Sequence, residues 1–176
     1  MNGKKEELAG IVGKTNVLDK PEMLEAYSRD QSFALPIKPR FVVKPKNVDE
    51  VKGIVGEAVA KEIKEKSLAL YNYAKEYTQK RGIIISDTKF EFGLNDGKLI
   101  IIDELLTPDS SRFWGIEQYQ VGRSQPSYDK QPVRDWLSAS GWDKKPPAPM
   151  LSSEVIEGTT ERYRQAYERL TGKKLR

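Results

Sequence analysis

The 176-residue sequence contains no cysteine and no histidine. The absence of cysteine excludes a disulfide framework and thiol chemistry. The absence of histidine excludes imidazole base catalysis and histidine-based zinc sites. A metal site in this chain must therefore be built from carboxylates, and oxygen ligands of that kind favour Mg²⁺ or Mn²⁺.

Long apolar runs are also missing from the sequence. No stretch approaches the length that a membrane-spanning helix needs, and the charged first eight residues do not resemble a signal peptide. We therefore expect a soluble, cytoplasmic protein without a membrane partner.

Charge of either sign is present in nearly equal amounts, with 30 basic and 26 acidic residues and a net charge of +4. No basic run is long enough to favour nucleic acid, so we expect no nucleic-acid partner. A weak positive bias fits a phosphorylated small molecule equally well. The chain length suits one domain or slightly more.

Apolar residues at helical spacing follow Asn47 and continue to Tyr77. Asn47 and Glu50 have the spacing of a capping box, which predicts a helix start. Gly53 and Gly56 weaken the early part of this pattern. The segment is therefore either one long helix or two helices that meet near Gly56.

Two further helices are predicted in the second half of the chain, over residues 129–138 and from Ser152 or Ser153 to about Leu170. Serine is a preferred N-cap residue, and Gly172 follows the last helix as a stop signal. The residues after Pro108 show no regular pattern until about Ser127.

A β-hairpin is the clearest signal in the sequence. Ile83–Ile85 predicts a buried strand, residues 89–94 alternate charged and aromatic side chains, and Leu99–Ile102 predicts the returning strand. Asn95-Asp96-Gly97 between them is a turn. The predicted fold is α+β, with helices packed on a small antiparallel sheet centred on a hairpin at about residues 83–103.

The register of this hairpin decides its chemistry, because side chains alternate between the two faces of a strand. A three-residue loop, Asn95–Gly97, pairs Glu91 with Ile101 and Lys89 with Asp103. One face then carries charge, and the other is the predicted core face. The charged face holds Lys89, Glu91, Ile101 and Asp103, and the core face holds Phe90, Phe92, Ile100 and Ile102. A two-residue loop would instead put Asp103 on the core face.

Lys89, Glu91 and Asp103 on one face form a candidate site for a Mg²⁺-nucleotide complex. The carboxylates are hard oxygen ligands, and the ammonium suits phosphate or carboxylate charge. The order Asp87, Lys89, Glu91 and Asp103 is also similar to the catalytic segment of protein kinases. The alternative is a solvated strand face with a Lys–Asp pair worth about a few tenths of a kcal/mol, and spacing alone favours that alternative.

Two polar stretches are candidates for anion binding. The first, residues 107–114, places Ser110, Ser111 and Arg112 beside two aromatic residues, and the second places Lys130 and Arg134 at a helix start. Hydroxyl and guanidinium groups suit phosphate or carboxylate recognition. A serine-rich turn and an ordinary capped helix explain the same residues equally well.

Several strings together resemble the SAICAR synthetase family over about residues 57–176. They are Arg81–Ile85, Asp87–Gly93, Asp103–Trp114, Ser127–Gln131, Pro147–Pro149, Glu154–Ile156 and Tyr163–Gly172. Enzymes of this family are ATP-dependent ligases of purine biosynthesis. They join L-aspartate to the carboxylate of CAIR, which ATP activates as an acyl phosphate, and release SAICAR, ADP and phosphate.

The resemblance implies a role for each candidate residue. Glu91 and Asp103 would bind Mg²⁺ and ATP, and Lys89 is expected to act with them in catalysis. Arg112, helped by Ser110 and Ser111, would hold anionic substrate groups. Lys130 and Arg134 are weaker candidates for the same pocket.

Residues 1–56 do not resemble the nucleotide-binding front half of that family. They resemble the start of FAD-linked oxidases of the glycolate oxidase or D-lactate dehydrogenase type, on Tyr27–Asp30, Pro39–Pro45 and Val48–Val51. The flavin pyrophosphate loop of those oxidases is not found, so we expect no FAD. The sequence thus predicts two truncated segments, 1–56 and 57–176, joined near Gly56.

This division leaves three functions open. The first is SAICAR-synthetase-like ligation, impaired by the missing ATP-binding lobe. The second is a non-catalytic remnant or oligomerisation module, since an unpaired sheet edge invites association and allows a homo-oligomer. The third, an FAD-linked oxidoreductase fragment, depends only on residues 1–56.

Overall fold

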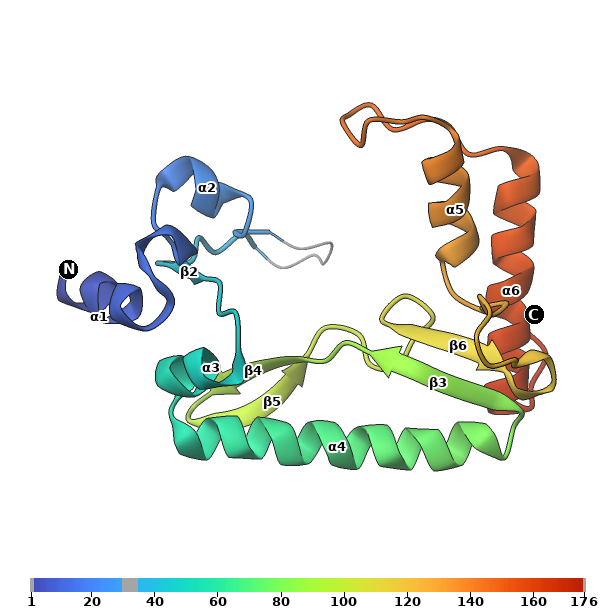
Figure 1. Ribbon diagram of the computed structural model, residues 1–176, viewed down its shortest axis with the longest axis horizontal. Coiled ribbons are helices and arrows are strands. Elements are labelled where there is room, and N and C mark those ends of the chain that lie inside the picture. Colours follow the sequence, from blue (N-terminus) through green and yellow to red (C-terminus); the bar gives the residue numbers. More distant parts are fainter. Residues whose placement is uncertain (1, 30–34, 176) are drawn as a thin grey trace. The chain divides into compact units, whose positions relative to one another are not determined.

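The computed structural model describes residues 2–29 and 35–175 and divides into two compact units, residues 1–64 and 65–176 (Figure 1). The division falls inside a long helix, α4 (Glu57–Gln79). Asp30, part of one oxidase-like string, lies outside the described residues. The predicted division at residue 56 concerns sequence resemblance and stays a prediction.

The first unit contains a short two-stranded ladder, which the first helix of the chain contacts. Helix α1 (Asn2–Val12) leads through η1 (Lys14–Asn16) to β1 (Val17–Leu18), which pairs antiparallel with β2 (Val42–Val43). Helix α2 (Pro21–Glu25) lies between the strands in sequence. The core of this unit contains buried Leu8, Val12 and Val17, as the apolar spacing along α1 requires.

Helices α3 (Val48–Val55) and α4 are separate, which decides between the two alternatives for this segment. Gly56 has a φ of 87°, a backbone conformation that glycine adopts readily and that ends α3. The predicted cap of α3 is confirmed, because Asn47 Oδ1 accepts a 2.9 Å hydrogen bond from the backbone nitrogen of Glu50.

The second unit is built on a two-stranded sheet of β3 (Ile83–Thr88) and β6 (Ser111–Gly115), which are antiparallel. Ile83, Ile85 and Phe113 point to one face and are at most 3% exposed. Ala74 of α4 and Ala166 of α6 (Ser153–Thr171) complete this core. The prediction of an irregular chain after Pro108 is therefore wrong for β6.

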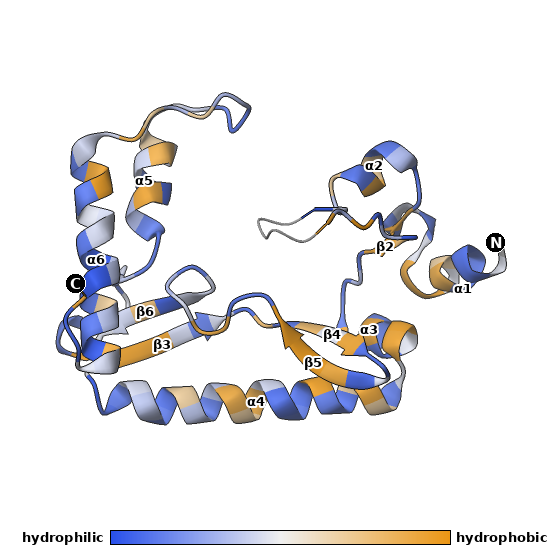
Figure 2. Cartoon of the chain, turned by 180° about the vertical axis from the view of Figure 1, so that it is seen from behind, coloured by the Kyte–Doolittle hydropathy of each residue, from blue (hydrophilic) through white to orange (hydrophobic). Residues whose placement is uncertain are grey.

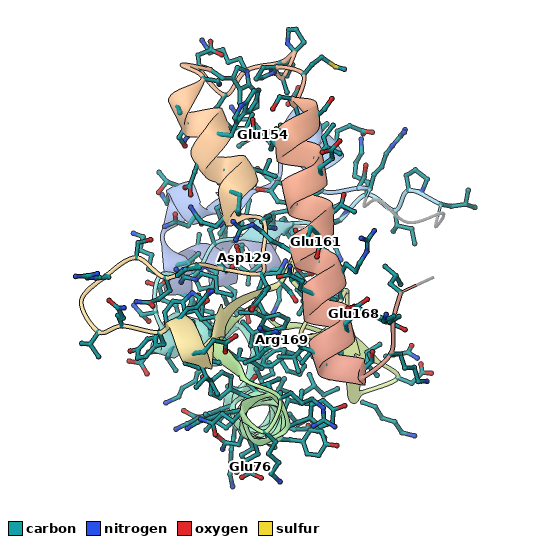
Figure 3. All side chains as sticks on the ribbon, turned by 90° about the vertical axis from the view of Figure 1, so that its right-hand side faces the viewer. Glu76, Asp129, Glu154, Glu161, Glu168 and Arg169 are labelled. Atoms are coloured by element: carbon teal, nitrogen blue, oxygen red, sulfur yellow. The ribbon has the colours of Figure 1, made fainter. Side chains whose placement is uncertain are left out.

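Helix α5 (Gln131–Ala139) packs against α6, and both ends of α6 are capped as the sequence predicts. Ser152 Oγ accepts from the backbone nitrogen of Val155, and Gly172 follows the last turn with a φ of 69°. Figure 3 labels Glu154, Glu161 and Glu168 at seven-residue intervals down α6. In the described ranges no helix is long and apolar enough to cross a membrane.

A separate hairpin consists of β4 (Glu91–Asn95) and β5 (Lys98–Ile102). Asn95 pairs with Lys98, so the loop has two residues and the predicted three-residue register is wrong. Asp96 and Gly97 both have positive φ, 48° and 74°, which is the conformation of a type I′ turn. That turn matches the twist of antiparallel strands, which explains why it is preferred to the longer loop.

The predicted core face of the hairpin is also wrong, because the shorter loop shifts every cross-strand pair. Glu91 pairs with Ile102, and Phe92 with Ile101. The isoleucines of β5 stay 38–42% exposed, and the core of the second unit contains no hairpin residue among those described. Figure 2 shows β5 as a hydrophobic strand.

Overall the chain combines helices with small antiparallel ladders, so the α+β fold class predicted from the sequence is confirmed. The structure corrects the arrangement within that class. Strand β3 pairs with β6 and not within the hairpin.

Candidate functional site

A polar cavity of about 480 Å³ opens in the second unit, beside the ends of β3 and β6. Four cationic and four anionic side chains line it, so its charge is balanced. The cations are Lys89, Arg112, Lys130 and Arg134, and the anions are Asp87, Glu104, Asp109 and Asp129. Pro108, Ser110 and Ser111 complete the lining.

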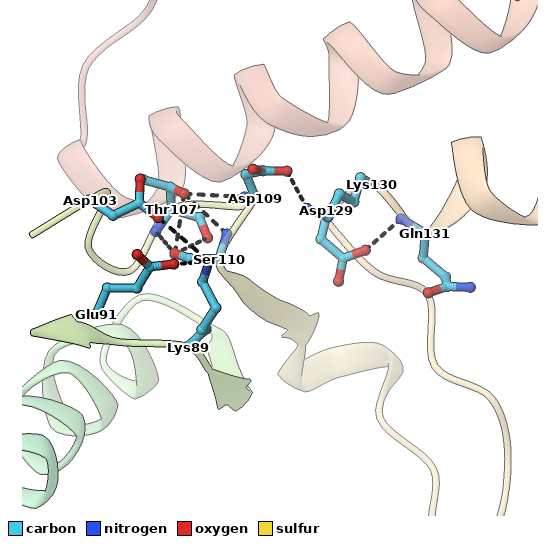
Figure 4. A network of polar contacts seen from close by, with 9 residues as sticks. All are labelled: Lys89, Glu91, Asp103, Thr107, Asp109, Ser110, Asp129, Lys130 and Gln131. Carbon is cyan, nitrogen blue, oxygen red and sulfur yellow. Dashed lines mark hydrogen bonds and ion pairs between the residues drawn. The ribbon is translucent and has the colours of Figure 1, made fainter. Parts of the chain in front are cut away.

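Lys89, Glu91 and Asp103 lie together (Figure 4), and of these three Lys89 alone lines the cavity. Lys89 Nζ is 2.6 Å from Glu91 Oε1 and 3.5 Å from Asp103 Oδ2. The hydrogen bond to Glu91, followed by the charge of that residue, raises the pKa of Lys89. One ammonium therefore holds two carboxylates, one from the first residue of β4 and one from the residue that follows β5.

The backbone geometry that brings Lys89, Glu91 and Asp103 together differs from the predicted one. In the observed register, a regular strand would point Asp103 away from the face that carries Glu91. Asp103 instead has a φ of 64°, so the chain leaves the ladder at this residue and its carboxylate comes within reach of Lys89. Aspartate is among the few residues that tolerate the left-handed region.

Arg112 forms a two-point ion pair with Asp87 across the β3–β6 sheet. Nε and Nη2 of Arg112 donate to the two carboxylate oxygens of Asp87, each over 2.6 Å. The hydrogen bond to Arg112 lowers the pKa of Asp87. Arg112 is thus held at the cavity wall. In the sequence, Asp87 belongs to the kinase-like series and to one family string, but it was not selected there as a site residue.

The two predicted serines are engaged with the protein itself. Ser111 is 5% exposed, and its hydroxyl lies 2.9 Å from Thr88 Oγ1. Ser110 Oγ accepts a hydrogen bond of 3.1 Å from the backbone nitrogen of Thr107 in the turn before β6. The carbonyl of Ser110 also accepts a hydrogen bond of 2.9 Å from the backbone nitrogen of Lys89.

Lys130 and Arg134 both reach the cavity from the start of α5. Lys130 is ion-paired with Asp109, and that hydrogen bond lowers the pKa of Asp109. Desolvation, followed by the charge of nearby Asp109, raises the pKa of Glu104. Arg134 makes no ion pair with any residue that the structure describes, so its guanidinium is available to a ligand.

Glu104, Asp109 and Asp129 are cavity residues that sequence reasoning did not select. Asp129 is 3% exposed and accepts a 2.6 Å hydrogen bond from the backbone nitrogen of Gln131, which starts α5 (Figure 4). The available signal was an aspartate before a helix, which more often marks a cap than a site. In this structure the N-cap of α5 is Lys130, and Asp129, one residue earlier, lines the cavity.

The carboxylates of the site do not gather into a metal cage formed by protein alone. Within the described parts of the chain, no group of three or more acidic side chains is arranged to hold a metal ion. Glu91 and Asp103 are a pair, and a pair of carboxylates is what Mg²⁺ takes when phosphate oxygens and water supply the remaining ligands.

The sequence model of the SAICAR synthetase family matches residues 42–149, and the chain belongs to this family. The match begins inside the segment 1–56 and includes all of the predicted site residues. A phosphoribosylaminoimidazole-succinocarboxamide synthase of Thermodesulfovibrio yellowstonii is 54% identical over 123 residues, which are 70% of this chain and 42% of that protein. The corresponding synthase of Methylobacillus flagellatus is 56% identical over 68% of this chain and 41% of its own length.

Solved structures of the same family resemble this one. The SAICAR synthase of Saccharomyces cerevisiae, complexed with SAICAR, has 41% identity and a TM-score of 0.66 over 77% of this chain and 46% of its own. A SAICAR synthetase in complex with ADP has 30% identity and a TM-score of 0.53 over 76% of this chain and 47% of its own. The chain thus spans less than half the length of each of these relatives.

Proposed function

We propose that this chain carries the substrate and Mg²⁺-ATP site of a SAICAR-synthetase-like ligase, which joins L-aspartate to the carboxylate of CAIR in purine biosynthesis. The observation that supports the proposal most is the convergence of Lys89, Glu91 and Asp103, with Lys89 in the lining of a charged cavity. That cavity lies in the part of the chain that matches the family. Two solved relatives are complexed with SAICAR and with ADP, respectively.

Glu91 and Asp103 are the proposed ligands of Mg²⁺. The fit is supported by the way they already hold a cation, since the ammonium of Lys89 bridges them. Two carboxylates together with nucleotide phosphates form a usual Mg²⁺ site. When bound, the ion would offset phosphate charge, and Lys89 would turn its ammonium toward a phosphate or carboxylate oxygen.

The other cationic side chains of the cavity are the proposed holders of the anionic substrates. Arg112 offers a planar guanidinium, and Lys130 and Arg134 add charge from the start of α5. L-aspartate also carries an ammonium group, and the anionic wall of Asp109 and Asp129 provides an acceptor for it. A cavity with both signs of charge suits a substrate with both signs of charge.

We expect ligation by this chain alone to be slower by orders of magnitude than ligation by a full-length homologue. The chain spans 42% of its relative from Thermodesulfovibrio yellowstonii. Phosphoryl transfer needs the groups that hold the ATP phosphates to act together with the metal ligands. An assay of SAICAR formation, run beside a full-length homologue, measures this difference.

A non-catalytic assembly module is the second candidate. The exposed isoleucines of β5 favour it, because an edge strand with an apolar surface invites pairing with another chain. Size-exclusion chromatography with light scattering would detect the homo-oligomer that this function requires. The flavin-dependent alternative and the expected absence of FAD stay predictions, which the absorbance spectrum of the purified protein tests.

Isothermal titration calorimetry with MgATP, CAIR and L-aspartate tests the ligase proposal directly. The chain should bind each of them, and Glu91→Gln should abolish binding of MgATP. Glu76→Gln is the matched control, because Glu76 is an exposed glutamate of α4 outside the cavity. Equal MgATP affinity in wild type and Glu91→Gln would remove Glu91 from the site, and no binding of any substrate would favour the assembly module.

A further inference from the structure

Strand β3 contains an irregularity immediately before the cavity. Ile85 pairs with Phe113, yet the next pair in the ladder is Asp87 with Arg112, so Ser86 is an extra residue without a partner of its own. A bulge of this kind adds one residue to one strand and re-aims the side chains that follow it.

The bulge determines which side of the sheet Asp87 occupies. In a regular ladder Ser86 would face Arg112, and Asp87 would lie on the same face as Ile85 and Phe113, which are buried. The extra residue brings Asp87 opposite Arg112 on the cavity side instead. The next pair is pinned as well, because Thr88 Oγ1 lies 2.9 Å from Ser111 Oγ.

The contact between Asp87 and Arg112 uses one edge of the guanidinium. Nε and Nη2 donate to Asp87, so the Nη1–Nη2 edge keeps its donors and has no partner among the residues described. Both side chains are more than half exposed, which makes the pair a weak contributor to stability. Its geometry nevertheless fixes the plane of the guanidinium, since two parallel hydrogen bonds define it.

We propose that Asp87 is a positioning residue, which the bulge at Ser86 places so that Arg112 presents its Nη1–Nη2 edge to a carboxylate or phosphate group in the cavity. The inference rests on the proposed role of Arg112 in substrate binding. It adds that an anion contacts Arg112 at the Nη1–Nη2 edge, because Asp87 occupies the Nε–Nη2 edge.

The change in anion affinity caused by Asp87→Asn, weaker or stronger, distinguishes this positioning role from a simple electrostatic one. If Asp87 only competed with the ligand for Arg112, removal of its negative charge would strengthen anion binding. If Asp87 orients Arg112, the same change weakens binding, by about tenfold or more, because asparagine accepts from Nε but presents a donor to Nη2.

Two measurements on the full chain test the proposal. The first is the ¹⁵N NMR signal of Arg112 Nε–H, assigned with Arg112→Lys, which should be sharp in wild type and broadened in Asp87→Asn. The second is calorimetric titration with L-aspartate and with inorganic phosphate, which shows whether the anion is a carboxylate or a phosphate. Asp87→Glu keeps the charge but shifts the carboxylate by one methylene, so it should restore only part of the affinity.

Tighter anion binding by Asp87→Asn, or an unchanged Arg112 signal in that variant, would overturn the positioning role. Complete recovery of affinity in Asp87→Glu would also overturn it, because charge alone would then suffice. Failure of the proposed ligase function would give a different experimental result. In that case wild type binds neither probe, while the Arg112 signal still reports whether Asp87 holds the guanidinium.

Discussion

Lys89 Nζ lies 3.5 Å from Asp103 Oδ2, although the hairpin register would direct these side chains apart if both strands were regular. The left-handed backbone of Asp103, with a φ of 64°, brings the two groups together. The geometry of the candidate metal site therefore depends on one backbone conformation as well as on two charges.

Three substitutions at Asp103 separate the two contributions. Asp103→Asn should lose MgATP binding with little change in the midpoint of thermal unfolding, because asparagine tolerates the left-handed region. Asp103→Ala should lose binding and also about 1–2 kcal/mol of stability, since alanine is strained there. Asp103→Gly should lose binding without the strain. Calorimetry and thermal unfolding measure the two effects, and wild-type affinity in Asp103→Asn would contradict the metal role.

Glu117 and Arg169 provide a test of pH dependence away from the cavity. Arg169 Nη2 lies 2.6 Å from Glu117 Oε1, and this hydrogen bond lowers the pKa of Glu117 from its ordinary value of 4.5. The stabilisation is present above pH 4.5 and is lost as the pH falls through the lower pKa of the folded state. Figure 3 shows Arg169 on α6.

Glu117→Gln should therefore lower the midpoint of thermal unfolding at pH 7, by a small amount because both partners are partly exposed. The difference from wild type should disappear in strongly acidic buffer. A difference that stays constant from pH 7 down to acid would show that the charge of Glu117 is not what stabilises this contact.

Phe113 should dominate the stability of the second unit. Its side chain is 1% exposed between β3, α4 and α6, and Phe113→Ala should cost about 3–5 kcal/mol. Leu94→Ala on the hairpin is the control, because Leu94 is 58% exposed and its loss should cost about 0.5 kcal/mol or less. Urea unfolding measures both, and equal losses would place the hydrophobic core elsewhere.

Asn47 should stabilise α3 through its cap. Asn47→Ala should cost about 1 kcal/mol, whereas Asn47→Ser should cost little because serine also caps well. Amide hydrogen exchange in residues 48–52 is the appropriate measurement, since the effect is local to the first turn. Unchanged exchange in Asn47→Ala would mean that the cap contributes nothing to the helix.

Local signals in the sequence were sufficient for the helices and for part of the core. The cap at Asn47 and the burial of Ile83 and Ile85 were predicted and are confirmed. The break at Gly56 and the cap at Ser152 were each one of two alternatives, and the structure decides for them. Each depends on contacts within a few residues or on continuous apolar character. Pairing of β3 with β6 involves a strand with mixed composition, and this is why β6 was missed.

The hairpin shows the limit of such reasoning. Asn95-Asp96-Gly97 is compatible with loops of two or three residues, and the observed loop is the two-residue type I′ turn and not the predicted longer one. The convergence of Lys89, Glu91 and Asp103 was expected, but for an incorrect geometric reason. Glu104 and Asp109 reach the cavity through irregular backbone between β5 and β6, which periodicity does not describe.

The unpaired Ser86 gives β3 one residue more than the ladder with β6 needs beside the cavity wall. Exchange of Ser86 for another polar residue keeps the count of residues and leaves the frame of β3 intact. Deletion of Ser86 would remove the bulge and join Asp87 directly to Ile85, so Asp87 would still lie opposite Arg112, on the face away from Phe113. Loss of one residue at this position should therefore be a change that homologues can carry without losing the pair of Asp87 and Arg112.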